Sequence, residues 1–360
     1  MNKQRKDTER MKHLERFFQP DGWQEGSFTN RQGKKIRTGH ATPKGACKGT
    51  VVITTGYADF TEAYFETIHN YLDRGYAVWM MDWAGHGGSE KVRKGQQTDQ
   101  KKVAILDDHI ADLEQFRKTV VAPVTGKPVF LSTHSMGGQV ALRYLDKHPD
   151  DFAGAMLATP FVDMNMTGAK RSVMQRAFES AVALGFGDKV LENGRKRAIH
   201  KIVEARRTRK AQNPIRMRLH KTLMWLPRDL KAEEPTVAYL ENMYRSATYL
   251  NKPGVLEGIQ TPVLFGIGGR DDMVDNEAIR RAAKALPNGK LCEIDEASHA
   301  FWLERDDLLK IWWDRIDGFM ADCHAAFDRK NKPVNDNGLN ENDRAQQQPR
   351  KPKPPQAKGS

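Results

Sequence analysis

The fold is decided by residues 128–138, which have the sequence PVFLSTHSMGG. The first six residues form an apolar, β-branched pattern typical of a buried strand, and the apolar spacing from Gly138 to His148 indicates a helix. A serine at such a sharp strand-to-helix turn is lifted above the sheet when compact residues stand two positions before and after it. Gly137 meets the second condition, and Thr133 stands where the strict motif has glycine. The turn favours Ser135 as a nucleophile, with a simple helix N-cap as the alternative.

Strand and helix patterns alternate on both sides of this turn. Buried strands are predicted at residues 49–56, 76–82, 128–133, 152–160, 262–268 and 290–295. Helices are predicted at residues 61–74, 103–120, 138–148, 274–286 and 306–328. Repeated strand–helix units of this kind predict the α/β class, with a mostly parallel central sheet and helices on both faces. Residues 161–250 show no strand pattern, so we expect a helical cap inserted above the carboxyl edge of the sheet.

Charge is distributed unevenly along the 360 residues. The net charge of +12 is concentrated at residues 1–19 (+3), 189–221 (+10) and 329–360 (+5), which leaves the remainder at −6. We therefore divide the chain into a basic N-terminal helix at 1–20, a catalytic domain at 21–328 and a disordered basic tail at 329–360. The segment at 189–221 lies inside the predicted cap. It is either a solvated face or a surface for anionic lipid headgroups.

Several protein classes are disfavoured by composition. The three cysteines are far apart, and neither a CxxC pair nor an HExxH motif occurs, so we expect no metal and no organic cofactor. No recognised nucleic-acid reading module is present, and we expect no nucleic-acid partner. An apolar signal region and a stretch of about 18 apolar residues are also absent. This predicts a cytoplasmic protein, peripheral at the inner face of the membrane if the basic cap segment binds lipid.

Two further polar residues follow later strands in the order that a serine triad of this topology requires. Asp271 follows the strand at 262–268, and an acid at the carboxyl end of a strand points into the site of an open α/β sheet. Its neighbour Asp272 is the alternative acid. His299 follows the strand at 290–295, and a histidine exchanges protons at neutral pH because its unperturbed pKa is about 6.5. The order of the three residues predicts the triad Ser135, Asp271 and His299.

An oxyanion hole needs two backbone N–H groups aimed at the developing negative charge. Met136, which follows the nucleophile, supplies one of them. The second is expected from Tyr57, in the loop after the strand at 49–56, where Gly56 permits close approach of the backbone.

The chain resembles the α/β-hydrolase family of bacterial lysophospholipases and monoacylglycerol lipases. The resemblance rests on the elbow HSMGG at 134–138, on Gly56 with EAYF at 62–65, and on DWAGHGGS at 82–89. Within the cap, NPIR at 213–216 and EPTVAYL at 234–240 are also similar. The sequence departs from the family pattern at Thr133, Thr55 and Ala84, of which the last two bear on the side chains supporting the oxyanion loop.

The resemblance implies hydrolysis of a carboxylic ester of a lipid, lysophospholipid or monoacylglycerol, through an acyl-enzyme. Ser135 would be the nucleophile, His299 the base and then the acid, and Asp271 the residue that orients the imidazole. The expected substrate contacts are Gly56, His134, Met164 and Trp225, the last two among apolar cap residues suited to an aliphatic chain. The alternatives are a short-chain esterase or peptidase on the same fold, and a catalytically silent binding module.

Overall fold

The central element of the fold is an eight-stranded sheet. The structure is a computed structural model, and it describes residues 14–91, 103–164, 166, 168–190, 199–225 and 230–331. The strands follow the spatial order β1-β2-β4-β3-β5-β6-β7-β8. Their bounds are β1 Gln24–Thr29, β2 Lys35–Ala41, β3 Gly49–Thr54, β4 Tyr76–Met81, β5 Val129–His134, β6 Gly154–Ala158, β7 Val263–Gly268 and β8 Gly289–Ile294. Strands β3 to β8 are parallel, which confirms the predicted α/β class and the mostly parallel sheet.

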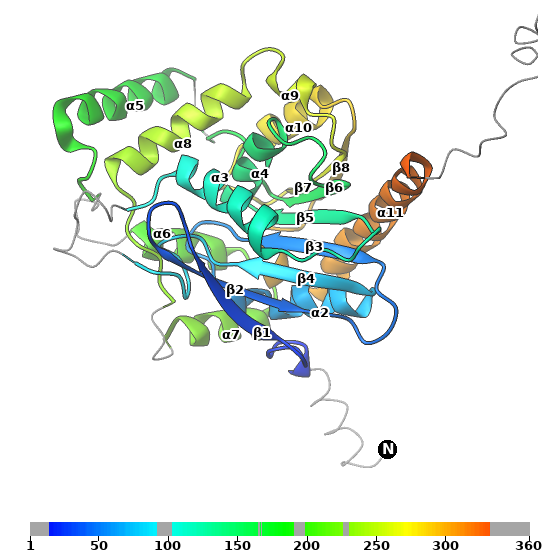
Figure 1. Cartoon of the computed structure of the whole chain (residues 1–360). Coiled ribbons are helices and arrows are strands. Elements are labelled where there is room, and N and C mark those ends of the chain that lie inside the picture. Colours follow the sequence, from blue (N-terminus) through cyan, green and yellow to red (C-terminus); the bar gives the residue numbers. More distant parts are fainter. Residues whose placement is uncertain are drawn as a thin grey trace, which may run out of the picture.

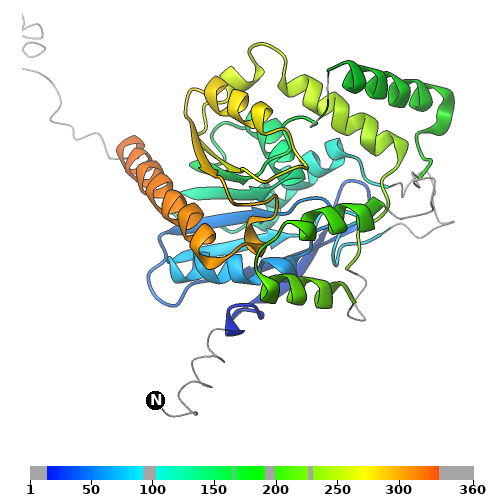
Figure 2. The same ribbon diagram turned by 180° about the vertical axis from the view of Figure 1, so that it is seen from behind.

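Helices cover both faces of the sheet (Figures 1 and 2). One face packs against α3 Leu106–Gln115, α4 Met136–Leu145 and α10 Asn276–Ala285. The other packs against α2 Phe65–Asp73 and α11 Asp306–Lys330. Short helical turns complete the body, namely η1 Thr61–Tyr64, η2 Phe116–Val120, α9 Val255–Gly258 and η4 Phe301–Leu303. Each face thus has its own apolar core, because strands such as β3 and β7 are buried along their whole length.

The first two strands form an antiparallel hairpin that the sequence patterns did not predict. β1 pairs with β2 from Gln24 opposite His40 to Thr29 opposite Lys35, and β2 pairs antiparallel with β4. The residues of β1 are almost all exposed, so they carry no apolar pattern of their own. The hairpin extends the parallel sheet at one edge.

Described residues of the predicted cap, 161–250, are mainly helical. They form α5 Gly168–Ala181, η3 Val182–Phe186, α6 Ile199–Arg209, α7 Pro214–Trp225 and α8 Val237–Leu250. Two isolated bridges, Met164 with Val274 and Val190 with Thr236, are the extended contacts recorded for this region. The arrowheads of β3 and β4 point toward the side where α6 lies, so the cap stands at the carboxyl edge of the sheet (Figure 1).

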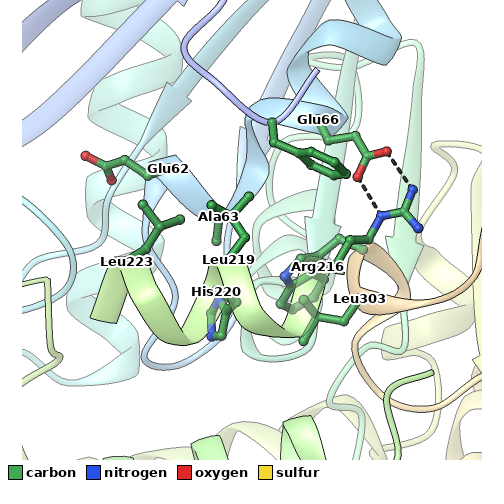
Figure 3. A pocket seen from close by; sticks show the side chains of 10 residues that line it. Glu62, Ala63, Glu66, Arg216, Leu219, His220, Leu223 and Leu303 are labelled. Atoms are coloured by element: carbon green, nitrogen blue, oxygen red, sulfur yellow. Dashed lines mark hydrogen bonds and ion pairs between the residues drawn. The ribbon is translucent and has the colours of Figure 1, made fainter. Parts of the chain in front are cut away.

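A buried arginine, Arg216, joins helix α7 to the body through ion pairs. Arg216 is 3% exposed, and its guanidinium donates to Glu66 Oε1 at 2.6 Å and to Glu66 Oε2 at 2.7 Å. It also pairs with Asp306 Oδ1 at 2.5 Å. Figure 3 shows the Arg216–Glu66 pair beside a small cavity, which has a volume of about 20 Å³ and lies between α7, η1 and η4.

The predicted N-terminal helix at 1–20 lies largely outside the described residues, which begin at Leu14. Phe17 is nevertheless buried against the body, whereas Phe18 is 60% exposed. Of the predicted tail at 329–360, residues 332–360 also lie outside the described part, and α11 ends at Lys330. Among the helices that the structure describes, none is long and apolar enough to cross a lipid bilayer.

Candidate active site

Ser135 occupies a strained turn between β5 and α4. Its backbone has φ 49° and ψ −115°, a conformation that costs a non-glycine residue about 1–3 kcal/mol and persists only where its surroundings enforce it. The Ser135 N–H donates to the Ala158 carbonyl at 3.1 Å, and its carbonyl accepts from Gly138 and Phe161, each at 2.9 Å. These three bonds hold the hydroxyl above the sheet.

The turn also depends on the missing side chain of Gly137. A Cβ atom at this position would lie 2.6 Å from the carbonyl oxygen of Thr55, so the helix and the loop after β3 approach more closely than any other residue allows. On the other side of the serine, Thr133 is 4% exposed and sits within β5, paired with Thr54 of β3. The strand therefore accommodates threonine where the strict motif has glycine.

The structure brings Ser135, His299 and Asp271 together in one hydrogen-bonded chain. His299 Nε2 lies 2.9 Å from Ser135 Oγ, and His299 Nδ1 lies 2.7 Å from Asp271 Oδ2. The side chains of His299 and Asp271 are 3% and 0% exposed. Asp272, the alternative acid, instead pairs with Arg209 and Lys210 of the cap. The geometry thus selects Asp271 as the partner of the histidine.

The two expected oxyanion donors lie beside the serine. Tyr57 and Met136 both line the cavity that contains Ser135. Met136 is the first residue of α4, where the N–H groups of a helix have no partner within the helix and carry its positive dipole end. The loop that carries Tyr57 is supported by Trp83, whose buried indole N–H donates to the Thr55 carbonyl at 2.8 Å. This bond provides a support for the oxyanion loop although Thr55 and Ala84 depart from the family pattern.

The cavity at the serine has a volume of about 290 Å³ and is mostly apolar. Besides the residues already named, its lining consists of Phe161, Val203, Arg206, Arg207, Pro235, Tyr239, Leu240, Met243, Met273 and Val274. Most of these come from α6, from α8 and from the loops after β6 and β7. The volume and lining are sufficient for an organic ligand with an aliphatic part.

Three of the four expected substrate contacts do not line this cavity. Gly56 lies against His134, since a Cβ on Gly56 would be 2.6 Å from His134 Nδ1. His134 is 1% exposed and is buried behind the triad. Met164 packs against the core and forms an isolated bridge with Val274. The side chain of Trp225 lies outside the described part of the chain. Met164 shows that an apolar cap residue can serve core packing instead of lining the cavity, and the contact expected from Trp225 stays a prediction.

Behind the triad, His134 lies within hydrogen-bond distance of two acceptors. Its Nε2 is 3.1 Å from the His299 carbonyl oxygen, and its Nδ1 is 3.3 Å from Asp59 Oδ2. Burial lowers the pKa of His134 to about 4, although the hydrogen bond with Asp59 acts in the opposite direction. The neutral ring can donate to one of the two acceptors, and the Thr159 hydroxyl donates to the same His299 carbonyl at 2.7 Å. With the ring proton donated to Asp59, the Thr159 hydroxyl is the side-chain donor that holds the His299 carbonyl.

Within the described part of the chain, no group of three or more His, Cys, Asp or Glu side chains is arranged to hold a metal ion.

The eight-stranded, mostly parallel sheet, the nucleophile turn and the chain order serine, acid, histidine define an α/β-hydrolase. Residues 45–306 match the family described as serine aminopeptidase, S33. The chain belongs to that family.

Relatives with similar sequences carry ester-hydrolase names. Human monoglyceride lipase is 28% identical over 144 residues, which is 39% of this chain and 45% of the relative. Caffeoylshikimate esterase of Arabidopsis thaliana is 33% identical over 37% of this chain and 39% of the relative. These matches thus span less than half the length of either relative. Probable lysophospholipase L2 of Haemophilus influenzae is 21% identical, over 74% of this chain and 82% of the relative.

Solved structures support the fold. A soluble variant of monoglyceride lipase from Saccharomyces cerevisiae, in complex with a substrate analog, superposes with a TM-score of 0.65 at 16% identity. The alignment covers 85% of this chain and 98% of that structure. Monoacylglycerol lipase of Paleococcus ferrophilus gives a TM-score of 0.60 at 18% identity, over 78% of this chain and 98% of that one. The α/β-hydrolase fold that the sequence predicts is confirmed.

Proposed function

We propose that this protein is a serine hydrolase that cleaves carboxylic esters of lipids, lysophospholipid or monoacylglycerol, through an acyl-enzyme. The observation that carries the proposal is the hydrogen-bonded chain Ser135–His299–Asp271 at the apolar cavity of about 290 Å³. The names of the relatives, monoglyceride lipase and lysophospholipase, support the same class of substrate.

The geometry supports a two-step acyl transfer. His299 Nε2, 2.9 Å from Ser135 Oγ, takes the hydroxyl proton while Oγ attacks the ester carbonyl carbon. The oxyanion then accepts from the N–H groups of Met136 and Tyr57, and the protonated imidazole passes its proton to the departing alcohol. Water, deprotonated by the same imidazole, hydrolyses the acyl-serine and releases the acid. Asp271 holds the ring with its proton on Nδ1, so that Nε2 is free to accept.

Charge in the cavity favours an ester over a free peptide. A peptide substrate of an aminopeptidase presents a positively charged amino terminus, which an acidic side chain would bind. Among the described residues that line the cavity there is no carboxylate, whereas Arg206 lines it, as does Arg207, whose charge is paired with Asp59. The apolar side chains on α8, such as Leu240 and Met243, suit an acyl chain instead.

A covalent probe and a substrate panel test the proposal. We expect a fluorophosphonate to label the wild-type protein and Ser135→Ala to remain unlabelled. Monoacylglycerol, lysophosphatidylcholine and p-nitrophenyl esters of rising chain length should be hydrolysed by the wild type, with activity falling at least about 10³-fold in Ser135→Ala. A folded wild-type protein that neither reacts with the probe nor hydrolyses any ester would falsify the enzyme proposal and favour the silent binding module. Cleavage of amino-acid anilides alone would favour the peptidase.

We also propose that the cap contacts an anionic membrane surface. Fewer basic residues of segment 189–221 are available for this contact than its net charge suggests. Arg207, Arg209, Lys210 and Arg216 of that segment pair with acids of the body, and the side chains of Arg207 and Arg216 are buried, so these four charges are already compensated. Exposed apolar side chains gather instead on and around α5 and η3. They are Met166, Val173, Met174, Leu184, Phe186 and Val190, between 37% and 72% exposed.

Liposome sedimentation tests this contact. We expect binding to anionic vesicles at low salt, weaker binding at high salt, and a loss of binding when Leu184 and Phe186 are replaced by glutamate. Equal binding under all conditions, or none, would contradict the membrane contact without touching the esterase proposal. The cytoplasmic location stays a prediction from the sequence.

A further inference from the structure

One short segment of the cap contacts three of the loops that carry the candidate site, those after β3, β7 and β8. Residues 207–213, here the bridging segment, run from the end of α6 to the start of α7. In the loop after β3, Arg207 contacts Tyr57 and Asp59. In the loop after β7, Lys210 contacts Arg270 and Asp272. In the loop after β8, Gln212 contacts Glu296. The cap is therefore tied to the oxyanion, acid and histidine loops through seven consecutive residues.

Arg207 is the most deeply buried of the basic residues in this segment. It is 2% exposed, and its Nη1 lies 2.7 Å from Asp59 Oδ1, whose side chain is 0% exposed. Its Nη2 donates to the carbonyl oxygen of Tyr57 at 2.7 Å. The guanidinium also lies over the ring of Trp302, 5.7 Å from the centroid. One planar group thus binds a backbone carbonyl and a carboxylate at once, which a guanidinium can do because its nitrogens are spread in a rigid fork.

The loop that Arg207 binds needs external support. Ala58, between the two contacted residues, has φ 61°, a backbone region that disfavours residues with a side chain. Asp59 would be costly to bury as a carboxylate, but the charge of Arg207 and the hydrogen bond from His134 outweigh burial and hold the pKa of this carboxyl well below its usual range. Tyr57, the expected oxyanion donor, is therefore followed by a strained peptide whose geometry depends on a cap residue.

We propose that Arg207 is a positioning residue for the oxyanion hole: by holding the Tyr57 carbonyl and the Asp59 carboxylate together, it aims the Tyr57 N–H at the substrate oxygen. The inference deepens the proposed esterase and rests on it. Arg207 touches no reacting atom in this role. The oxyanion hole is complete only while α6 is seated on the loop, so catalytic competence depends on the position of the cap.

A second buried arginine of the cap provides a matched control. Arg216 of α7 is 3% exposed and, like Arg207, binds carboxylates of the body, namely Glu66 (Figure 3) and Asp306. It contacts neither the oxyanion loop nor any residue of the triad in the hydrogen bonds recorded for it. A purely structural role for both arginines predicts the same consequences of replacing either one.

Kinetics of matched variants separate the two roles. For Arg207→Met we expect kcat to fall by about 10- to 100-fold with KM changed by less than about threefold, because misaimed oxyanion donors affect the transition state. Arg207→Lys should be intermediate, since an ammonium cannot reproduce the fork. Arg216→Met should lower Tm but leave kcat within about twofold of the wild type. Measurements are made below the Tm of every variant.

A double variant separates positioning from charge burial. Asp59→Asn with Arg207→Met removes the uncompensated buried carboxylate, so it should regain Tm while kcat stays low. Recovery of kcat in the double variant, or an equal fall of kcat in Arg216→Met, would overturn the positioning role.

Amide hydrogen exchange gives a readout that needs no activity. We expect exchange of the peptide covering residues 55–60 to be at least about tenfold faster in Arg207→Met than in the wild type or in Arg216→Met, because the strained loop loses its support. Unchanged exchange in this peptide overturns the inference. If the wild type is inactive while exchange responds as expected, the proposed esterase fails and the structural dependence of the loop on Arg207 stands.

Discussion

Replacing Asp271 by asparagine would change which nitrogen of His299 carries the proton. Asp271 Oδ2 accepts from His299 Nδ1 at 2.7 Å, and Oδ1 accepts from the Met273 backbone N–H at 2.7 Å. An asparagine must keep its carbonyl oxygen on the Met273 N–H, because its amide nitrogen cannot accept a hydrogen bond. The amide N–H then points at His299 Nδ1, which must present a lone pair. The ring proton moves to Nε2, where it faces Ser135 and blocks proton transfer.

The expected loss follows from this wrong tautomer. In a Ser-His-Asp triad it costs a factor of about 10⁴ in kcat, which is roughly 5.5 kcal/mol of transition-state stabilisation at about 1.4 kcal/mol per tenfold. KM should change little, since Asp271 is not among the residues lining the cavity. The assay is hydrolysis of a p-nitrophenyl ester, with active sites counted by fluorophosphonate labelling and folding checked by Tm.

The neighbouring acid supplies the control. Asp272 pairs with Arg209 and Lys210 and is one third exposed, so Asp272→Asn should lower kcat by less than about fivefold, as expected for exposed ion pairs worth about 1 kcal/mol or less. If Asp271→Asn keeps more than a tenth of the wild-type kcat, or if Asp272→Asn loses as much, the tautomer argument and the choice of acid are both refuted.

Gly137→Ala places a methyl group 2.6 Å from the Thr55 carbonyl oxygen, so we expect lower esterase activity and a loss of about 1–3 kcal/mol of stability by urea unfolding. Gly318→Ala, on the open face of α11, should instead add about 0.5–1 kcal/mol, and an equal effect of both changes would contradict the steric argument. Acid should destabilise the fold, because burial lowers the pKa of His86 and of His134 to about 4. Unfolding then takes up protons below about pH 6.5, and the free energy of unfolding falls by up to about 3 kcal/mol per histidine as pH approaches 4. A urea midpoint that stays constant from about pH 7 to pH 4 would contradict this.

The parallel strands and the triad could be predicted because each has a local sequence signal. Buried strands such as β5 and β7 are continuous apolar runs, and Ser135 and Asp271 follow them, whereas His299 follows the partly exposed edge strand β8. The β1–β2 hairpin gives no such signal, since β1 is polar and exposed along most of its length. What holds β1 in the sheet is its pairing with β2, and the residue pattern within β1 alone does not show that pairing.

The buried ion pairs of Arg207 and Arg216 in the cap could not be predicted for a different reason. A run of basic residues looks solvent-facing when its partners are distant in the chain. Arg216 and Glu66 are 150 positions apart, as are Arg207 and Tyr57. The lining of the cavity was missed in the same way, because Tyr239 and Met243 reach Ser135 only through the placement of α8.

The unequal burial of the cap helices has a consequence for how a lipid reaches the serine. The half formed by α6 and α7 is joined to the body by two buried arginines, and swinging it outward would leave Asp59 and Glu66 without their partners. Helix α5 has no buried residue and is held instead by part-buried polar contacts, such as Arg171 with Asp163 at 2.7 Å, so its displacement should cost less than that of α6 and α7. We therefore expect any opening of the cap that admits a lipid to involve the α5 side and to leave the contact of Arg207 with the Tyr57 carbonyl in place.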